Sequence, residues 1–559
     1  MSIQVTTIGD LVDHQAQRSH NDALVMPGAR LTYPQLSELT DRVAASLLGL
    51  GVGRGDKVAI LMPNTIDYIA ALIASAKLGA ITVPINGRFK VHECSHVVGH
   101  SDAKILITAA DPNGTDYPAL IGEVFPELRN HCAADELELA SAPFLRRIVN
   151  LDSTTPGGCL TRADFERVRE RIDVEQVKAM QCRVRVRDIA LLVYTSGTTA
   201  RPKGCLLTHE ALTRHGENIV RTRFLLTEQD SFWDPLPLFH CGGIVPMFGC
   251  FAVGAKFCHP GFFEPKAALR TMEQERCTVL YPTFEPIWCA VLDHPDFAAT
   301  DLSAVRLIQN VAAPARLAQF EARMPFARQM PSYGSTECAA NLTIPLPDDP
   351  YEVRMHTSGR PLDGLEVQIV DPDTGTPLEP GQMGELCWRG YCSFEGYYKD
   401  DRATAAAFDD DGWFHSGDRA SVDPAGNLVY GGRLKDMLKV GGENVAAIEI
   451  EGYLVRHPAV AIAQVVGVPD ARYDEVPAAF VQLVPGQGLL ESELVEFCRG
   501  AIATYKVPRY VRFVTEWPMS GTKVQKFVLK ERLTAELAAA GITEAPKVIS
   551  NRSGRVDVR

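Results

Sequence analysis

Short apolar runs alternate with longer segments of helical periodicity in the first part of the chain. KVAILMPN (57–64) is a continuous apolar run, DYIAALIASAKLGA (67–80) repeats apolar residues at helical spacing, and ITVPIN (81–86) is a second run. AKILITAA (103–110) repeats the pattern. Apolar runs of this length are typical of buried strands, and their alternation with helices indicates parallel βαβ units. The pattern therefore predicts an α/β fold.

The pattern changes twice in the second half of the chain. Between residues 359 and 433, segments such as GLEVQIVD (364–371) and GELCWRG (384–390) alternate between Gly and Asp turns, which indicates short β-strands. From Leu434 onward, strands and helices predict a separate, small α+β unit. We therefore expect a large N-terminal domain (1–434) of βαβ subdomains plus a β-rich subdomain, a small C-terminal domain (435–540) and a disordered tail (541–559).

A loop rich in glycine and hydroxyl groups follows the apolar run 189–193. In YTSGTTARPKG (194–204), small or hydroxylated residues precede Lys203. Backbone N–H groups and hydroxyls supply neutral donors and the lysine supplies charge, a combination that holds phosphate. It is not a Walker A loop, because Pro202 stands where that motif has glycine. With a helix expected over His209–Arg221, we predict a strand–loop–helix phosphate site; a solvated turn between strands is the alternative.

A second polar loop, MPSYGSTECAAN (330–341), suits a nucleotide and its metal. Tyr333 offers an aromatic face for a base, and Gly334 allows close approach. Ser335 and Thr336 offer hydroxyls. The carboxylate of Glu337 is a hard oxygen ligand of the kind that Mg²⁺ accepts beside phosphate oxygens.

Three further polar residues stand at turns or strand ends. Asp418, in GWFHSGD, can accept both hydroxyls of a ribose, or it can cap its own turn; Arg433 ends a later strand. His240 precedes two glycines in PLFHCGGI (237–244), where it either lines the mouth of a pocket or serves as a structural histidine.

The charge and composition of the chain exclude some classes of binding partner and cellular compartment. The net charge of −13, with no basic cluster, argues against a nucleic-acid partner. The 14 cysteines form no CxxC pair and are typical of buried thiols in a reducing compartment. The N-terminus lacks the apolar core of a signal peptide, and no apolar run approaches the roughly 20 residues of a membrane span. We expect a cytoplasmic enzyme, and a homodimer is left open.

Four motifs, in this order and spacing, resemble those of the adenylate-forming (AMP-binding) superfamily. They are YTSGTTARPKG, YGSTE, GWFHSGD and GRLKDMLKVGGENV (432–445). That superfamily includes acyl- and aryl-CoA synthetases, firefly-type luciferases and peptide-synthetase adenylation domains, and the resemblance runs from about residue 8 to 535. The histidine of PLFHCGGI and the GENV segment are most similar to the acyl-CoA synthetase branch.

The resemblance implies an acid–CoA ligase that uses ATP, Mg²⁺ and coenzyme A. A carboxylate attacks the α-phosphorus of ATP, giving acyl-AMP and pyrophosphate, and the CoA thiol then releases AMP. Implied catalytic residues are Lys523, Thr336, Glu337 (the Mg²⁺ ligand) and His240. Implied ATP-binding residues are Thr195, Ser196, Gly197, Thr198, Thr199, Lys203, Tyr333, Gly334, Ser335, Asp418 and Arg433.

The resemblance also implies that the small domain is mobile. In such enzymes it rotates about a hinge, here Lys435, after the adenylate has formed. A loop with Lys439, Gly441 and Gly442 then serves the CoA step. Lys523 is the implied adenylation lysine, although Thr522 replaces the usual preceding glycine. Lys526 is the fallback.

The implied acyl pocket is mostly apolar and aromatic, which favours a hydrophobic acid (medium-chain fatty, aromatic or alicyclic). Its expected residues are Phe239, His240, Gly242, Phe284, Val311 and Ala312. Glu285 would suit a carnitine-like or other polar acid if it faced the pocket, and would have no bearing if it faced outward. A luciferase-like monooxygenase that uses the same adenylation site and a non-catalytic nucleotide-binding protein are the alternative functions.

Overall fold

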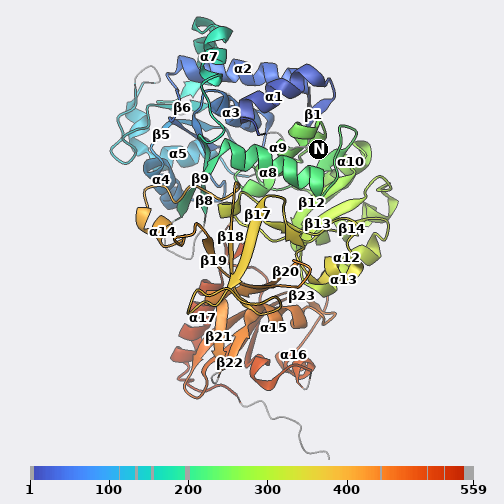
Figure 1. Ribbon diagram of the computed structural model, residues 1–559. Helices are drawn as coiled ribbons and strands as arrows, with labels where there is room; N and C mark the ends of the chain where they lie inside the picture. The colour runs from blue at the N-terminus through green and yellow to red at the C-terminus, as the bar shows by residue number, and fades with distance from the viewer. Residues whose placement is uncertain are drawn as a thin grey trace, which may run out of the picture.

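The computed structural model describes residues 5–112, 114–132, 136–152, 157–195, 202–440, 443–499, 501–520 and 523–546, without the side chains of Lys435, Glu443, Asn444, Ser520 and Lys523. Two largely parallel sheets lie side by side in the upper half of Figure 1, with a four-stranded antiparallel sheet below them and a small C-terminal unit at the bottom. The predicted α/β architecture is confirmed. The domain limits at residues 434 and 540 stay predictions.

The first sheet carries the predicted phosphate loop at one edge. Its strand order is β7-β6-β5-β3-β4-β8-β9, and only the last pair is antiparallel. The apolar runs at residues 57–64, 81–86 and 103–110 form central parallel strands, as predicted. The strands are β3 (Lys57–Leu61), β4 (Ile81–Pro84), β5 (Ala103–Thr108), β6 (Arg147–Asn150), β7 (Leu160–Thr161), β8 (Ile189–Thr195) and β9 (Lys203–Thr208).

The second sheet carries two of the predicted acyl-pocket residues, Phe284 and Val311, at the ends of its strands. Its order is β14-β13-β12-β10-β11-β1-β2, and only β1 and β2 pair antiparallel. The strands are β1 (Asp22–Met26), β2 (Ala29–Thr32), β10 (Ser231–Trp233), β11 (Lys256–Cys258), β12 (Val279–Phe284), β13 (Leu307–Val311) and β14 (Arg328–Gln329).

Helices pack around and between these two sheets (Figure 1). The longer ones bury an apolar face, as amphipathic helices do on a sheet. They are α1 (Ile8–Arg18), α2 (Tyr33–Gly49), α3 (Ile66–Lys77), α4 (Val91–His100), α5 (Tyr117–Val124), α6 (Arg162–Val168), α7 (Val174–Gln181), α8 (His209–Thr222), α9 (Cys241–Val253), α10 (Pro265–Gln274), α11 (Glu285–Leu292), α12 (Pro314–Arg323), α13 (Tyr351–His356) and α14 (Asp401–Ala405).

The antiparallel sheet follows the chain order β17-β18-β19-β20. Its strands are β17 (Leu365–Val370), β18 (Gly384–Gly390), β19 (Phe414–Val422) and β20 (Leu428–Arg433), and the short strands β15 (Thr343–Ile344) and β16 (Arg360–Pro361) pair beside it. This confirms the β-rich region that the sequence predicts between residues 359 and 433.

The C-terminal unit is built on one five-stranded sheet with three helices. Its elements are β21 (Met437–Val440), β22 (Glu443–Ala446), β23 (Val460–Asp470), β24 (Asp474–Leu483), β25 (Tyr510–Phe513), the hairpin β26 (Met519–Ser520) and β27 (Lys523–Val524), and α15 (Ala447–Leu454), α16 (Glu491–Cys498) and α17 (Lys526–Ala539). Among the described residues, its two clusters of buried side chains lie between Leu438 and Leu537, and the three other clusters lie between Ile8 and Leu428. The two parts of the chain therefore have separate cores.

The predicted strand–loop–helix unit is wrong in one respect. Residues 203–208 form β9, which returns antiparallel along β8, with Thr195 opposite Lys203. Helix α8 begins only after this strand, at His209. The run KGCLLT is long enough for a strand, and pairing with β8 satisfies its backbone groups. The loop is therefore the turn of a hairpin, and no helix begins at its end.

The first residues of the predicted tail contact the C-terminal unit. The Ala471 amide donates to the carbonyl of Thr543 at 2.9 Å, and the Ala545 amide donates to the Asp470 carboxylate at 2.6 Å. Residues 541–546 thus lie against the C-terminal unit. Residues 547–559 lie outside the described ranges.

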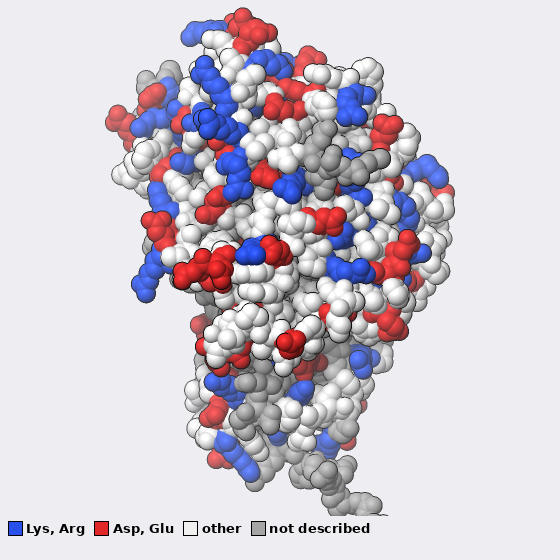
Figure 2. Space-filling model, viewed as in Figure 1, with Lys and Arg blue, Asp and Glu red and all other residues white. Residues whose placement is uncertain are grey.

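Lys and Arg are interspersed with Asp and Glu over the face shown in Figure 2. Mixed signs of this kind produce no large single-sign field on that face. Within the described ranges, no helix is both long and apolar enough to cross a bilayer.

Helices α8 and α9, which follow β9 and the His240 segment in the chain, pack closely at two glycines. A Cβ on Gly249 would lie 2.3 Å from the carbonyl oxygen of Gly216, and one on Gly216 would lie 2.3 Å from that of Val245. Both neighbours are backbone atoms, which cannot move aside as a flexible side chain could. The crossing therefore requires glycine at both positions.

We expect Gly249→Ala to lower the stability of the N-terminal part by about 1–3 kcal/mol, because the added methyl overlaps backbone. The measurement is the midpoint of thermal or urea unfolding. The matched control is Gly122→Ala in α5, where a Cβ meets no atom within 4 Å; there alanine should be neutral or stabilising by up to about 1 kcal/mol. Equal midpoints for the two variants would contradict the close crossing.

Candidate active site

The buried carboxylate of Asp418 contacts residues of two other predicted motifs, Tyr333 of YGSTE and Arg433 of GRLKDMLKVGGENV. Asp418 lies on β19 and is 4% exposed, and Arg433 lies opposite it on β20. The Arg433 Nε is 2.8 Å from Asp418 Oδ1, and the Tyr333 hydroxyl donates to Asp418 Oδ2 at 2.5 Å. Residues that the sequence separates by about a hundred positions thus meet at one point.

The surroundings of this carboxylate keep each partner in a fixed protonation state. Burial, and next the charge of Asp418, raise the pKa of Tyr333 well above its usual range, so the phenol stays a donor. Burial alone would lower the pKa of Arg433, but the charge of Asp418 and smaller contributions from Tyr430, Tyr333 and Glu337 together outweigh burial, and the pKa is raised. The Tyr333 ring packs against Tyr430, with ring centroids 5.5 Å apart. A carboxylate this buried is tolerable because it is both paired and hydrogen-bonded.

Sequence reasoning missed Tyr397, whose side chain contacts both Glu337 and Lys203. Its hydroxyl donates to Glu337 Oε1 at 3.1 Å, and the Lys203 Nζ lies 4.9 Å from the centroid of its ring. The backbone of this segment is anchored to β9, because the Tyr398 amide donates to the carbonyl of Gly204 at 2.8 Å. The signal was the aromatic pair in GYYKD (396–400), which has no predicted chemistry of its own.

The YGSTE loop folds back tightly on itself. A Cβ on Gly334 would lie 1.7 Å from the carbonyl oxygen of Ala340, so no larger residue fits. Ala340 has φ of 122°, and the preceding Ala339 has φ of 56°, both in the left-handed region. Gly334 therefore permits the close approach of the chain itself, whereas the sequence suggested the approach of a ligand. Ser335, Thr336 and Glu337 remain partly exposed on this turn.

Several predicted residues fall outside the described part of the chain. These are Ser196, Gly197, Thr198, Thr199, Gly441 and Gly442, together with the side chains of Lys435 and Lys523. The backbone of Lys523 begins β27 opposite Ser520. Lys439 lies exposed on β21, and its amide donates to Glu475 Oε2 at 3.1 Å.

The fallback lysine, Lys526, forms an ion pair with Glu451. Its Nζ lies 2.6 Å from Glu451 Oε1, and this carboxylate oxygen also accepts from the Val465 amide at 2.7 Å. Both charged side chains are largely buried, with 22% and 13% exposed. The pair ties α17 to α15 and β23 in the core of the C-terminal unit.

The predicted acyl-pocket residues come from three neighbouring segments. The rings of Phe239 and His240 meet edge to face just before and at the start of α9, with centroids 4.7 Å apart, and Gly242 follows in its first turn. Phe284 and Val311 are directly paired at the ends of β12 and β13. Val311 is 48% exposed, and Ala312 is packed against the cluster beneath it.

Glu285 is paired with a cation of this chain. Its Oε1 lies 2.6 Å from the Arg316 Nε, which connects α11 to α12. The Arg316 Nη2 also donates to the Ala461 carbonyl at 3.4 Å, so the same arginine contacts the C-terminal unit.

The profile of the AMP-binding enzyme family matches residues 12–398, and that of the AMP-binding enzyme C-terminal domain matches residues 449–523. The chain belongs to the AMP-binding enzyme family.

Relatives and solved structures of this family match almost the whole chain. The putative acyl-CoA synthetase YngI of Bacillus subtilis (strain 168) is 37% identical over 537 residues, 94% of this chain and 97% of the relative. The mitochondrial medium-chain acyl-CoA ligase ACSF2 of Rattus norvegicus is 31% identical over 544 residues, 95% of this chain and 88% of the relative. The crystal structure of the anthranilate CoA ligase AuaEII with anthranoyl-AMP has a TM-score of 0.82 and 28% identity, covering 97% of this chain and 99% of that chain.

These matches confirm the predicted family and branch. The protein is an AMP-forming acid–CoA ligase, and its reaction uses ATP, Mg²⁺ and coenzyme A.

A buried histidine forms a hydrogen bond with the last residue of the polar loop 330–341 of the ligase. His215, on α8, donates from Nε2 to the carbonyl of Asn341 at 2.7 Å. Burial lowers its pKa to about 4, and burial likewise lowers the pKa of His209 and of His259 to about 4. These imidazoles therefore stay neutral in the folded chain at pH values where an unfolded chain would protonate them.

We expect the ligase to lose stability as the pH falls from about 6.5 to about 4. The unfolded chain binds protons in this window and the folded chain does not, so each histidine subtracts up to about 1.4 kcal/mol per pH unit. The measurement is the urea midpoint against pH. His215→Gln should flatten the dependence, whereas His20→Gln, at an exposed position, should leave it unchanged. A dependence that His215→Gln does not alter would contradict this account.

Proposed function

We propose that this ligase activates a hydrophobic carboxylic acid, of medium-chain fatty, aromatic or alicyclic type. The observation that carries this proposal is the Glu285–Arg316 pair. Because Arg316 neutralises the one acidic residue of the expected pocket region, the pocket does not require a cationic acid. The remaining expected lining, from Phe239, Phe284 and Val311, is apolar. The names of the relatives, a medium-chain acyl-CoA ligase and an anthranilate CoA ligase, agree with such an acid.

In the first half-reaction an anionic carboxylate must approach an anionic phosphate, so positive charge around the triphosphate lowers the barrier. Lys203 and Arg433 would supply fixed charge. Glu337 suits Mg²⁺, because it is a partly exposed carboxylate oriented by the Tyr397 hydroxyl. Mg²⁺ held there would neutralise phosphate oxygens. Thr336 would contact the α-phosphate.

The adenosine would lie against the Tyr333–Asp418–Arg433 cluster. Tyr333 would face the adenine, and the ribose hydroxyls would share the Asp418 carboxylate with its two present partners. Thr195 and the neighbouring residues 196–199 would cover the β- and γ-phosphates, with Gly334 and Ser335 at the α-phosphate turn. His240 would gate the acyl pocket.

Lys523 would bridge the attacking carboxylate and the α-phosphate. The alternative, Lys526, is less suited because its ammonium is committed to Glu451. The C-terminal unit would then rotate at Lys435, which removes Lys523 and brings the segment of Lys439, Gly441 and Gly442 to the CoA thiol.

We infer a cytoplasmic location from the thiols. All 14 cysteines are free, and most are buried, as expected in a reducing compartment. A homodimer stays an untested prediction.

The substrate class can be tested with a panel of acids. We expect CoA-dependent AMP release with octanoate or benzoate, at a kcat/KM roughly tenfold or more above that for acetate or carnitine, because an apolar pocket gains from each buried methylene. The measurement is release of pyrophosphate and AMP with and without CoA. Preference for carnitine would overturn the substrate class, and an adenylate consumed only with oxygen would indicate monooxygenase chemistry.

The role of Lys523 can be separated from that of Lys526. We expect Lys523→Ala to abolish acyl-AMP formation while thioester formation from supplied acyl-AMP continues, because only the first step needs the bridging charge. Lys526→Ala should instead lower the unfolding midpoint, since it leaves Glu451 buried without its partner. Equal loss of both half-reactions in Lys523→Ala would refute the assignment.

A further inference from the structure

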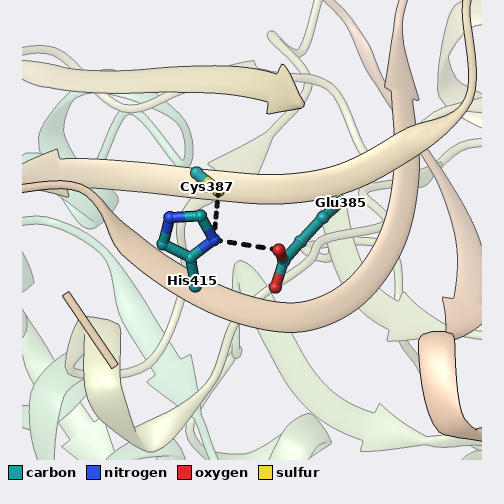
Figure 3. A group of neighbouring side chains, drawn as sticks. All are labelled: Glu385, Cys387 and His415. Atoms are coloured by element: carbon teal, nitrogen blue, oxygen red, sulfur yellow. Dashed lines mark hydrogen bonds and ion pairs between the residues drawn. The ribbon is translucent and has the colours of Figure 1, made fainter. Parts of the chain in front are cut away.

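Three potential metal ligands converge on one face of the antiparallel sheet, outside the expected ATP and acyl sites. Cys387 on β18 lies directly opposite His415 on β19. Glu385 precedes Cys387 by two residues on the same strand, and side chains two apart on a strand share a face. Figure 3 shows the imidazole of His415 between the other two side chains.

The distances join both neighbours to the same ring nitrogen. His415 Nδ1 is 2.9 Å from Glu385 Oε2 and 3.4 Å from Cys387 Sγ (Figure 3). All three ligand atoms lie within 4.8 Å of one another. Zinc binds nitrogen, oxygen and sulfur at about 2.0–2.3 Å in a tetrahedron, which places ligand atoms roughly 3.3–3.7 Å apart. The two distances to Nδ1 are close to this range, and the ion would draw Cys387 Sγ and the Glu385 carboxylate, which lie within 4.8 Å of each other, into it. No other set of three such donors is this close within the described ranges.

The residues around the cluster are arranged as supports for metal ligands. The Gly417 amide donates to Glu385 Oε1 at 2.9 Å, which leaves Oε2 directed at the imidazole. On the far side of the ring, His415 Nε2 is 3.7 Å from Asp409 Oδ2. A carboxylate behind a ligating histidine fixes its tautomer and orientation. Asp409 and His415 are 35% and 28% exposed, so solvent reaches this part of the cluster.

We propose that Glu385, Cys387 and His415 bind a zinc ion, with water as the fourth ligand. On binding, the thiol of Cys387 releases its proton to solvent, and the imidazole proton moves from Nδ1 to Nε2, facing Asp409. A thiolate and an imidazole select zinc over Mg²⁺, which prefers oxygen ligands, so this site differs from the one expected at Glu337. The ion would link β18 to β19, the strand that also carries Asp418.

The test uses the full-length protein, freed of metal by a chelator and then titrated with zinc against a competing indicator dye. We expect one zinc per chain, and a loss of at least tenfold in affinity in Cys387→Ser. Asp409→Asn should weaken binding about 10- to 100-fold, as changes to a carboxylate that orients a ligating histidine do. The matched control is Cys182→Ser at an exposed cysteine, which should bind zinc as the unmodified protein does. Equal affinity in Cys387→Ser would overturn the proposal.

Two readouts are independent of the ligase reaction. Cobalt in place of zinc should give a thiolate-to-cobalt charge-transfer absorption that Cys387→Ser lacks. Zinc should also raise the thermal unfolding midpoint of the unmodified protein but not of Cys387→Ser, because an ion bound only to the folded state stabilises it. Since neither measurement contains ATP, acid or CoA, its failure leaves the proposed substrate and residue roles unaffected. Absence of both signals in the unmodified protein would refute the site.

Discussion

The carboxylate of Asp418 is the group on which the arrangement of the candidate site depends. An anion that is 4% exposed is tolerated only if its oxygens are paired, because water no longer solvates it. Tyr333 and Arg433 meet this requirement from opposite directions in the sequence, one from the YGSTE loop and the other from the end of β20. The two motifs are therefore one electrostatic unit, and a shift of either would take one partner away from a buried charge.

Much of the fold could be predicted because buried strands and helices have recognisable patterns of apolar residues. Strands β3, β4 and β5 are covered on both faces, so they are continuous apolar runs, and α3 between them keeps helical spacing. The hairpin β8–β9 was harder to predict. The six residues of β9 alternate only weakly, so the sequence predicts no strand between the loop and the helix that begins at His209. Pairing with β8 decides the conformation, and such pairing depends on residues across the turn.

Residues of the candidate site were likewise predictable only where they lie in a motif with recognisable chemistry. Tyr333, Asp418 and Arg433 were predicted together because each lies in a motif with its own chemistry and resemblance, and the structure places them in contact. Tyr397 has no such chemistry, and its position between Glu337 and Lys203 depends on backbone pairing between β9 and a segment nearly 200 residues later. The orientation of Glu285 was undecidable for a similar reason, since its partner Arg316 stands 31 positions away on another helix.

The hairpin geometry has a consequence for how the phosphate loop can vary. Thr195 and Lys203 are cross-strand neighbours, so the two ends of the loop are anchored side by side on the sheet edge. The seven residues between them (196–202) can change in number without altering where Lys203 stands. Closing a longer loop costs little, only about 0.6 kcal/mol for each doubling of length. The length of the loop and the position of Lys203 can therefore change independently of each other during evolution.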